Sequence, residues 1–260
     1  YFMKRMNASE RQNQIVDLLS QNGVMKIMDI ADHFNVSRET IRRDLIILED
    51  DNRIKKWFGG VISANEHQDF NIQSIEQKIE LNTDVKMEIC KKALEFIPPQ
   101  SDIFLGDGST VLCLAKLLNQ TSGHTIITSS VQVVNACIKS NNKVIMCGGM
   151  ITPLGMSAVG APTIDFLSSL KTDIAFLGSS GFKLNNGPTG NDFESCNVKT
   201  TALKNAQTRI LLADSSKALS SSLITFASWD EVDYLITDSN LDSNVKNRIS
   251  ESTKIIFADQ

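Results

Sequence analysis

Short apolar runs alternate with longer amphipathic segments from about residue 84 to the end of the chain. The runs are rich in Ile, Val and Leu, which favours buried strands, and the segments between most of them carry apolar residues at helical spacing. Such alternation is typical of a largely parallel sheet with helices on both faces, so it predicts a Rossmann-like, mostly parallel α/β domain. The predicted strands are 103–105, 125–128, 144–146, 174–177, 210–213, 235–237 and 255–258, and the clearest helices are 111–118, 131–138, 193–205 and 244–251.

The first 62 residues follow a different pattern, in which helical periodicity comes first and β-prone residues appear only at the end. Ser9 and Gln12 have the spacing of a capping box, and they precede an apolar face that continues to Leu19. A second helix is expected over about 27–34, and a third begins after Ser37. Three short helices, the last two joined by a tight turn, predict a helix-turn-helix.

The third of these helices combines an apolar face with a basic face. Ile41 and Leu45 recur at helical spacing on the apolar side, and the hydroxyl at position 37 can cap the first turn. Arginines on the other side offer paired donors to phosphates and guanine edges, as in a helix that enters a major groove. An ordinary amphipathic helix with a solvated charged face is the alternative. The candidate DNA-binding residues of this helix are Ser37, Arg38, Thr40, Arg42 and Arg43.

Residues 53–62 form two short β-prone runs around a glycine pair, which predicts a β-hairpin wing after the third helix. A basic wing can contact backbone phosphates and so add salt-dependent affinity without reading the base sequence. The polar stretch that follows lacks apolar periodicity and is expected to be a linker. The predicted domains are a winged helix-turn-helix at 6–62, a linker at 63–83 and the α/β domain at 84–260. The candidate wing contacts are Arg53, Lys55, Lys56, Gly59 and Gly60.

Composition narrows the class of protein. With 42% hydrophobic and 22% charged residues, a chain of 260 residues has the material for a small domain and a larger one, each with a core. Residues 1–62 hold ten basic and nine acidic residues, so the excess acid behind the net charge of −4 lies in the remainder. The five cysteines are far apart, so neither a disulfide framework nor a metal site is predicted, and no cofactor is expected. No apolar run or leader suggests a membrane or export, which favours a cytoplasmic protein.

Four loops at the carboxyl ends of predicted strands carry glycines or hydroxyl groups, and ligands of parallel sheets collect at these ends. Glycines allow close approach of a backbone, and hydroxyls with free N–H groups at a helix start can hold an anion, most naturally phosphate. Tight turns and helix caps would explain each loop alone, but the four together favour a small-anion pocket. The candidate residues are Gly106, Asp107, Gly108, Ser109 and Thr110, then Thr128, Ser129 and Ser130, then Gly148 and Gly149, and finally Lys217.

Two charged residues of the predicted helix at 193–205 are candidates for contacts to the rest of a ligand. Glu194 and Lys199 follow a predicted loop and could reach the hydroxyls of a sugar. Their spacing of five residues is equally compatible with a solvated helix face. Both interpretations stand on the sequence alone.

Two sets of motifs occur in the order found in one known family, and together they cover nearly the whole chain. On these motifs the chain resembles the DeoR family of bacterial transcription regulators. The first set is Glu10-Arg11 through Gly60, with Val36-Ser37, Thr40-Ile41-Arg42-Arg43-Asp44-Leu45 and the Gly59-Gly60 wing. The second set is Gly108-Ser109-Thr110, Gly148-Gly149, Phe176-Leu177-Gly178, Gly181, Ala213-Asp214-Ser215-Ser216-Lys217 and Ile236-Thr237-Asp238.

The resemblance implies a DNA-binding repressor, usually of carbohydrate genes. It also implies that the second domain is similar to ribose-5-phosphate isomerase and senses a phosphorylated sugar or related metabolite. We expect the bound metabolite to release the protein from double-stranded operator DNA. A homodimer or homotetramer is expected, because one short recognition helix reads few bases and symmetric half-sites add specificity.

Several positions depart from the family pattern. Gly106 stands where the family commonly has aspartate, and Asp107 occupies the variable position beside it; Ser129 and Phe58 replace a frequent asparagine and histidine. Altered contacts to sugar hydroxyls are therefore expected, and a constitutive DNA-binding regulator with a degenerate sensor is one alternative. An isomerase-like enzyme is the other. It is disfavoured because residues 178–181, at the position of the isomerases' acidic catalytic motif, contain no carboxylate.

Overall fold

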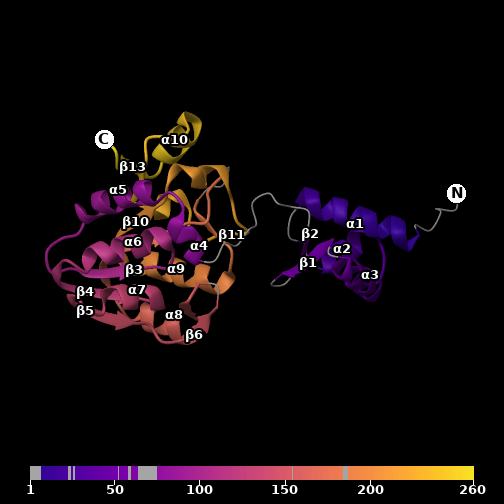
Figure 1. Ribbon diagram of the computed structural model, residues 1–260, viewed down its shortest axis with the longest axis horizontal. Helices are drawn as coiled ribbons and strands as arrows, with labels where there is room; N and C mark the ends of the chain where they lie inside the picture. The colour runs from indigo at the N-terminus through magenta and orange to yellow at the C-terminus, as the bar shows by residue number, and fades with distance from the viewer. Residues whose placement is uncertain are drawn as a thin grey trace. The chain divides into compact units, whose positions relative to one another are not determined.

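The chain forms two compact units, Tyr1–Asn71 and Ile72–Gln260, each with its own core. The computed structural model describes residues 7–22, 25, 27–51, 53–57, 60–63, 75–153, 155–183 and 187–260. Figure 1 shows the order of helices and strands along the chain. None of the helices in these ranges is long and apolar enough to cross a lipid bilayer.

The first unit consists of three helices and a hairpin, as the sequence predicts. The helices are α1 (Ala8–Asn22), α2 (Ile27–His33) and α3 (Arg38–Asp50), and the antiparallel strands are β1 (Ile54–Trp57) and β2 (Gly60–Ser63). All five elements contribute to one small core, in which the largest buried side chains include Ile15, Leu19, Ile30, Ile41 and Leu48. The fold is a winged helix-turn-helix.

A buried ion pair joins the first and third helices of this unit. Arg11 of α1 contacts the carboxylate of Asp44 on α3 through two nitrogens, at 2.6 and 3.2 Å, and Gln12 donates a third hydrogen bond at 3.0 Å. The side chain of Asp44 is only 4% exposed. The carboxylate therefore faces inward, away from the exposed arginines of the same helix, and ties α3 to α1.

The second unit is built on a seven-stranded sheet in which every neighbouring pair is parallel. Each of the seven predicted strands is confirmed. In spatial order the strands are β13 (Lys254–Phe257), β12 (Tyr234–Thr237), β10 (Ala206–Leu212), β8 (Thr172–Gly178), β3 (Asp102–Leu105), β4 (Ser122–Thr128) and β5 (Asn141–Met146). The edge strands β13 and β5 lie at the top and bottom of this unit in Figure 1.

Helices cover both faces of the sheet, because side chains of successive strand residues point to opposite sides. On β3, Phe104 enters one core while Ile103 and Leu105 enter the other. The helices over one face are α5 (Thr83–Leu94), α6 (Ser109–Leu118) and α7 (Val131–Cys137), and those over the other are α8 (Ala161–Ser168), α9 (Phe193–Asn205) and α10 (Ser243–Ser250). The fold class predicted from the sequence is thereby confirmed.

Smaller elements extend from the carboxyl ends of the strands. The strands β6 (Met150–Thr152) and β7 (Ser157–Val159) form a hairpin after β5, and β9 (Thr189–Gly190) pairs with β11 (Ile224–Thr225). Two 3₁₀ turns, η1 (Ser215–Leu219) and η2 (Trp229–Glu231), follow β10 and β11. The first helix of this unit, α4 (Ile75–Glu80), falls inside the range predicted as the linker.

Candidate functional site

The N-terminal turn of α3 has the local structure that its sequence predicts. Ser37 adopts extended backbone angles and its hydroxyl accepts a hydrogen bond from the backbone N–H of Thr40 at 3.1 Å. The hydroxyls of these two residues lie 2.9 Å apart. This cap fixes the start of the helix, and Ile41, Leu45 and Leu48 bury its inner face.

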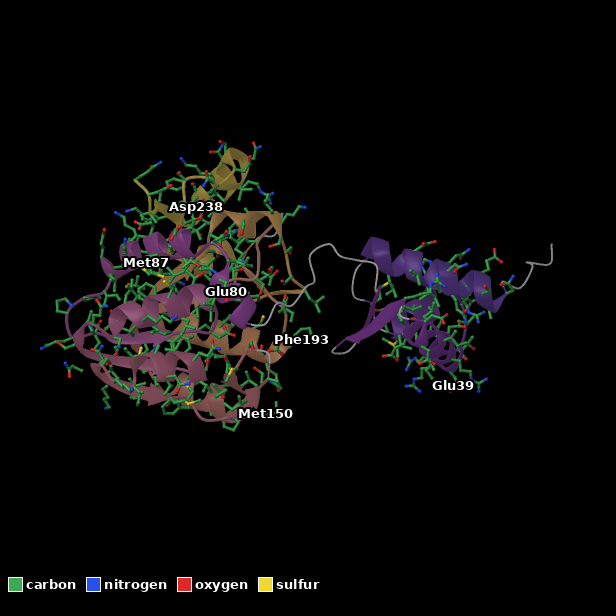
Figure 2. All side chains as sticks on the ribbon, in the orientation of Figure 1. Glu39, Glu80, Met87, Met150, Phe193 and Asp238 are labelled. Atoms are coloured by element: carbon green, nitrogen blue, oxygen red, sulfur yellow. The ribbon has the colours of Figure 1, made fainter. Side chains whose placement is uncertain are left out.

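Three arginines lie on the exposed side of α3. Arg42 is 63% exposed and sits 3.6 Å from Glu39, which lies at the outer edge of α3 in Figure 2. Arg38 contacts the sulfur of Met28 on α2 at 3.0 Å, and Arg43 is exposed. Exposed pairs of this kind contribute little to stability, so these guanidinium groups can exchange their present neighbours for nucleic acid at little cost.

The predicted wing is present as the β1–β2 hairpin. Lys55 and Lys56 lie in β1, and Gly60 is the first residue of β2. Arg53, immediately before β1, donates a hydrogen bond to Asn13 of α1 at 2.8 Å. The remaining predicted contact of the wing, Gly59, lies outside the described residues.

In the second unit, the loop after β3 connects the central part of the sheet to α6. Gly106 packs so closely that a β-carbon there would lie 2.7 Å from the side chain of Leu177 on β8. Gly108 precedes α6 with φ of 113°, in the left-handed region that favours glycine. Ser109 and Thr110 then form the first turn of α6, so the two hydroxyl residues open the helix as expected.

The next two predicted loops are built largely by internal contacts. Thr128 and Ser130 are buried, and the hydroxyl of Ser130 caps α7 by accepting from Val133. A β-carbon at Gly149 would lie 2.2 Å from the hydroxyl of Thr163, which itself donates to the carbonyl of Gly148 at 2.6 Å. Close packing therefore accounts for Gly149, and helix capping accounts for Ser130, whereas a β-carbon at Gly148 would meet no other atom within 4 Å.

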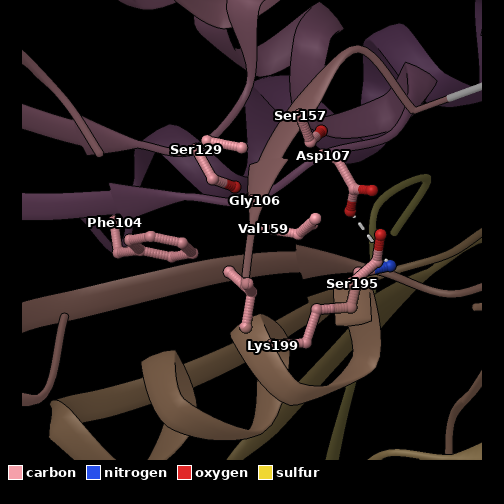
Figure 3. Close-up of a pocket in the computed structure, with 10 residues that line it drawn as sticks. Phe104, Gly106, Asp107, Ser129, Ser157, Val159, Ser195 and Lys199 are labelled. Atoms are coloured by element: carbon pink, nitrogen blue, oxygen red, sulfur yellow. Dashed lines mark ion pairs between the residues drawn. The ribbon is translucent and has the colours of Figure 1, made fainter. Parts of the chain in front are cut away.

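A pocket opens where the loops after β3 and β4 meet the β6–β7 hairpin and α9 (Figure 3). Polar side chains enter it from all four elements, and apolar residues form part of the wall. Its lining unites residues predicted from different loops with others that the sequence analysis did not single out. The lining residues are Phe104, Gly106, Asp107, Ser129, Ser157, Ala158, Val159, Ser195, Val198 and Lys199.

An ion pair spans this pocket, between Lys199 of α9 and Asp107 of the loop after β3. The ammonium lies 3.0 Å from Oδ1 of the carboxylate, and the two side chains are 11% and 17% exposed. Burial acts to lower the pKa of Lys199, but the charge and hydrogen bond of Asp107, together with the charges of Cys196 and Asp192, outweigh it, and the pKa lies above its usual value. Lys199 is therefore held as a cation.

Two further lysines near the predicted site were missed by the sequence analysis. Lys78 belongs to α4, and its pKa is lowered by burial and then by the positive charges of Lys217 and Lys199. Lys86 of α5 is buried and its ammonium donates to the carbonyls of Lys78 and Leu81, which anchors α4 to α5. Both come from outside the strand-end loops, so the spacing of residues along those loops carried no signal for them.

The fourth predicted loop supplies an acid and a base to the same region. Asp214 is buried, caps η1 and accepts a hydrogen bond from Asn82 at 3.2 Å. Its charge opposes the effect of burial on the pKa of Lys86, which is lowered by burial and by Lys217. The region thus contains the lysines at 78, 86, 199 and 217 against the carboxylates at 107, 192 and 214.

Four of the predicted ligand contacts line the pocket, namely Gly106, Asp107, Ser129 and Lys199. Glu194, exposed in the first turn of α9, does not line it, and neither do Gly108, Ser109, Thr110, Thr128, Ser130, Gly148, Gly149 and Lys217. Ser195, next to Glu194, does line it, as does Lys199 one turn later. Across the described ranges, no group of three or more His, Cys, Asp or Glu side chains is arranged to hold a metal ion.

Comparison with known proteins gives the same family over both units. The family described as DeoR C terminal sensor domain matches residues 81–239, and the DeoR-like helix-turn-helix domain matches residues 11–67. These two matches together span the winged helix-turn-helix and most of the α/β unit.

Curated relatives are similar over almost their full length. The glycerol-3-phosphate regulon repressor of Escherichia coli strain K12 is 30% identical over 90% of this chain and 92% of its own. The lactose phosphotransferase system repressor of Staphylococcus epidermidis is 32% identical over 96% of this chain and 100% of its own. A solved D-ribose-5-phosphate isomerase in complex with phospho-erythronic acid matches 52% of this chain and 53% of that chain, with 21% identity and a TM-score of 0.38. The relatives are named as regulators rather than enzymes.

Proposed function

This chain belongs to the DeoR family of transcription regulators, and we propose that it is a repressor released from operator DNA by a phosphorylated sugar. DNA is bound through α3 and the β1–β2 hairpin, and the sugar phosphate through the pocket at the carboxyl ends of β3 and β4. The regulated genes are those of carbohydrate metabolism, in line with the relatives that are named for the glycerol-3-phosphate regulon and the lactose phosphotransferase system.

The exposed arginines of α3 support the DNA-binding half of the proposal. Arg42 and Arg43 project from the side of the helix opposite its buried face, next to a capped N-terminus. In this geometry guanidinium groups can reach base edges in a major groove, while the basic residues of the wing contact phosphates. Because one short helix covers few base pairs, we expect a homodimer or homotetramer that binds symmetric half-sites.

The observation that carries the sensing half is the excess of positive charge around the pocket. Four lysines face three carboxylates, and two of the lysines have pKa values lowered by burial and by like charges. A phosphate monoester bears close to two negative charges at neutral pH, so it would offset that excess. The hydroxyls of Ser129, Ser157 and Ser195 supply hydrogen bonds in the same pocket.

The position of Lys78 suggests how the ligand affects DNA binding. Lys78 belongs to α4, the first helix of the second unit, and α4 is tied to α5 by the ammonium of Lys86. An anion in the pocket attracts Lys78 and so favours one position of α4 over others. A ligand that binds one arrangement of α4 more tightly shifts the population towards it, and we propose that this arrangement does not support operator binding.

The test is a gel-shift assay with the purified full chain and DNA from upstream of the neighbouring genes, titrated with a panel of sugar phosphates. The same panel is screened for an increase in melting temperature, because a ligand that binds only the folded state stabilises it. We expect one class of sugar phosphate both to raise the melting temperature and to release the DNA. The corresponding unphosphorylated sugars serve as matched controls and should do neither.

Three results would contradict the proposal in different ways. Specific operator binding with no thermal response to any sugar phosphate would indicate the alternative, a constitutive DNA-binding regulator with a degenerate sensor. Turnover of an aldose phosphate to a ketose phosphate by the purified chain would indicate an isomerase-like enzyme. Equal affinity for every promoter fragment and for random duplex DNA would contradict the proposed operator binding.

A further inference from the structure

The pocket that we assign to a phosphorylated ligand contains an acid, which by itself would repel that ligand. Asp107 follows Gly106 in the loop between β3 and α6, and its carboxylate points into the pocket (Figure 3). The side chain is 17% exposed, so its charge is only partly screened by water. An acid in this position requires a reason other than binding the phosphate.

In this turn, Asp107 lies between two glycines and its carboxylate lines the pocket. A β-carbon at position 106 would lie 2.7 Å from the side chain of Leu177, so glycine lets the loop approach β8 closely, and Gly108 has a left-handed backbone that favours glycine. The turn of the β6–β7 hairpin comes close on the other side, because a β-carbon at Gly155 would lie 3.5 Å from Oδ2 of Asp107. The carboxylate thus lies between Lys199 of α9 and the turn of the β6–β7 hairpin.

The two oxygens of this carboxylate differ in their surroundings. Oδ1 is paired with the ammonium of Lys199 at 3.0 Å, which fixes the orientation of the carboxylate. Within the part of the chain that the structure describes, Oδ2 accepts no hydrogen bond. A charged oxygen that is partly desolvated and lacks a donor favours a ligand that brings one, and hydroxyl groups are such donors.

We propose that Asp107 is a specificity-determining residue that selects phosphate esters carrying a free hydroxyl over phosphate esters without one. The ligand's hydroxyl donates to Oδ2 of Asp107, Lys199 holds the carboxylate through Oδ1, and the surrounding lysines bind the phosphate. A phosphate ester without hydroxyls meets the same lysines but gains no hydrogen bond to offset repulsion by the carboxylate. This inference rests on the proposed function and adds the residue that recognises the hydroxyl groups of the ligand.

The sharpest test compares ligands that differ only in hydroxyl groups. Glycerol 3-phosphate and n-propyl phosphate share a three-carbon chain, and sorbitol 6-phosphate and n-hexyl phosphate share a six-carbon chain. Binding to the full-length protein is measured by calorimetry and by thermal shift. We expect the hydroxylated member of at least one pair to bind about tenfold more tightly than its alkyl counterpart, the worth of one hydrogen bond to a charged group.

Substitution Asp107→Asn keeps the shape of the side chain and removes its charge. It should weaken binding of the hydroxylated ligand while leaving the alkyl phosphate unchanged or bound more tightly, so the ratio of the two affinities falls towards one. Asp192→Asn is the matched control: Asp192 caps α9 and adds negative charge near Lys199, and asparagine caps helices equally well. This control should leave the ratio unchanged.

Asp107→Asn alone leaves the buried ammonium of Lys199 without its partner, which could destabilise the fold. The double variant Asp107→Asn with Lys199→Met avoids this, because it replaces the whole ion pair by groups of similar size and leaves no buried charge unpaired. It should lose the preference for hydroxyls as well. Equal affinity of the unaltered protein for both members of each pair, or an undiminished ratio in a folded Asp107→Asn variant, would overturn the assignment of Asp107 alone. Failure of every phosphate ester to bind the unaltered protein would instead overturn the proposed sensing function.

Discussion

The charged groups of the two units are held in opposite ways. On α3 the side chain of Arg42 is 63% exposed, whereas in the pocket the side chain of Lys199 is 11% exposed. Hydrated charges cost the fold little, are screened by salt, and can be added or removed without disturbing a core. A charged side chain in the pocket is stabilised only by neighbouring groups of opposite charge, and it lowers the free energy of unfolding where no such group is present. We therefore expect substitutions on the DNA-binding face to change affinity alone and those around the pocket to change stability as well.

The Arg11–Asp44 ion pair is an exception to this contrast, because it is buried inside the first unit. Asp44→Ala leaves Arg11 with only a 13% exposed side chain and no carboxylate. We expect the first unit to lose about 3 to 5 kcal/mol of unfolding free energy, the usual cost of breaking a buried pair. Urea unfolding followed by far-ultraviolet circular dichroism measures it.

Asp50→Ala is the matched control for this substitution, because Asp50 is exposed at the end of the same helix. It should change the unfolding free energy by less than about 0.5 kcal/mol. If Asp44→Ala were equally mild, Asp44 would behave as a surface charge and the buried pair would contribute nothing to the position of α3.

Substitution Arg42→Ala should weaken operator binding by about tenfold or more, because a good contact from arginine to a base contributes about 1 to 3 kcal/mol. The thermal response to sugar phosphates should not change. Gel shifts at several salt concentrations measure the affinity. Lys91→Ala, an exposed lysine of α5 paired with Glu88, is the control and should bind the operator normally.

The converse is expected for Lys217→Ala, which removes one of the positive charges around the pocket. The variant should bind the operator with unchanged affinity but should no longer be released by the sugar phosphate. Its thermal shift with the ligand should fall by more than half. Normal release of the DNA would show that the fourth strand-end loop takes no part in the pocket.

A smaller effect, with the opposite sign for stability, is expected for Lys78→Met. The pKa of Lys78 is lowered by burial and by neighbouring lysines, so its charge destabilises the ligand-free fold. Its removal should raise the melting temperature of the free protein by about 1 to 3 °C and reduce the further rise that a sugar phosphate causes. Lys91→Met, at an exposed position, should do neither.

The smallest effect is chemical and lies entirely within the second unit. A hydrogen bond from Cys90 lowers the pKa of Cys113 to about 7, whereas burial raises those of Cys137, Cys147 and Cys196 to about 11. At pH 7.5 iodoacetamide should therefore modify Cys113 first, as measured by peptide mass spectrometry. Cys90→Ala should move half-reaction at Cys113 towards pH 8.5, the ordinary pKa of a thiol. An unchanged pH profile would contradict the role of Cys90.

The fold could be predicted from the sequence because its signals are local. Each strand of the seven-stranded sheet coincides with a short apolar run in the sequence. In the first unit, the cap at Ser37 and the glycines of the wing likewise indicate where the third helix begins and where the hairpin lies. The carboxyl ends of parallel strands necessarily meet at one edge, which is why the contributions of Asp107 and Ser129 to a common pocket could be anticipated.

The rest of the site depends on contacts between distant elements. Lys78 belongs to a helix inside a polar stretch that carries no clear apolar period, and Lys86 is a buried lysine whose hydrogen bonds go to backbone carbonyls. Neither has a sequence neighbour that reveals its role. Glu194 and Ser195 show the same limit on a finer scale, because only the geometry of α9 decides which of two adjacent side chains lines the pocket.

The separate hydrophobic cores of the two units have a consequence for how such proteins can diversify. Among the residues that the structure describes, no side chain of the small core belongs to either large core, so a gene fusion that exchanged Tyr1–Asn71 for another DNA-binding domain would remove no member of the large cores. Under the proposed function, recombination can therefore place a different promoter under the control of the same metabolite in one event.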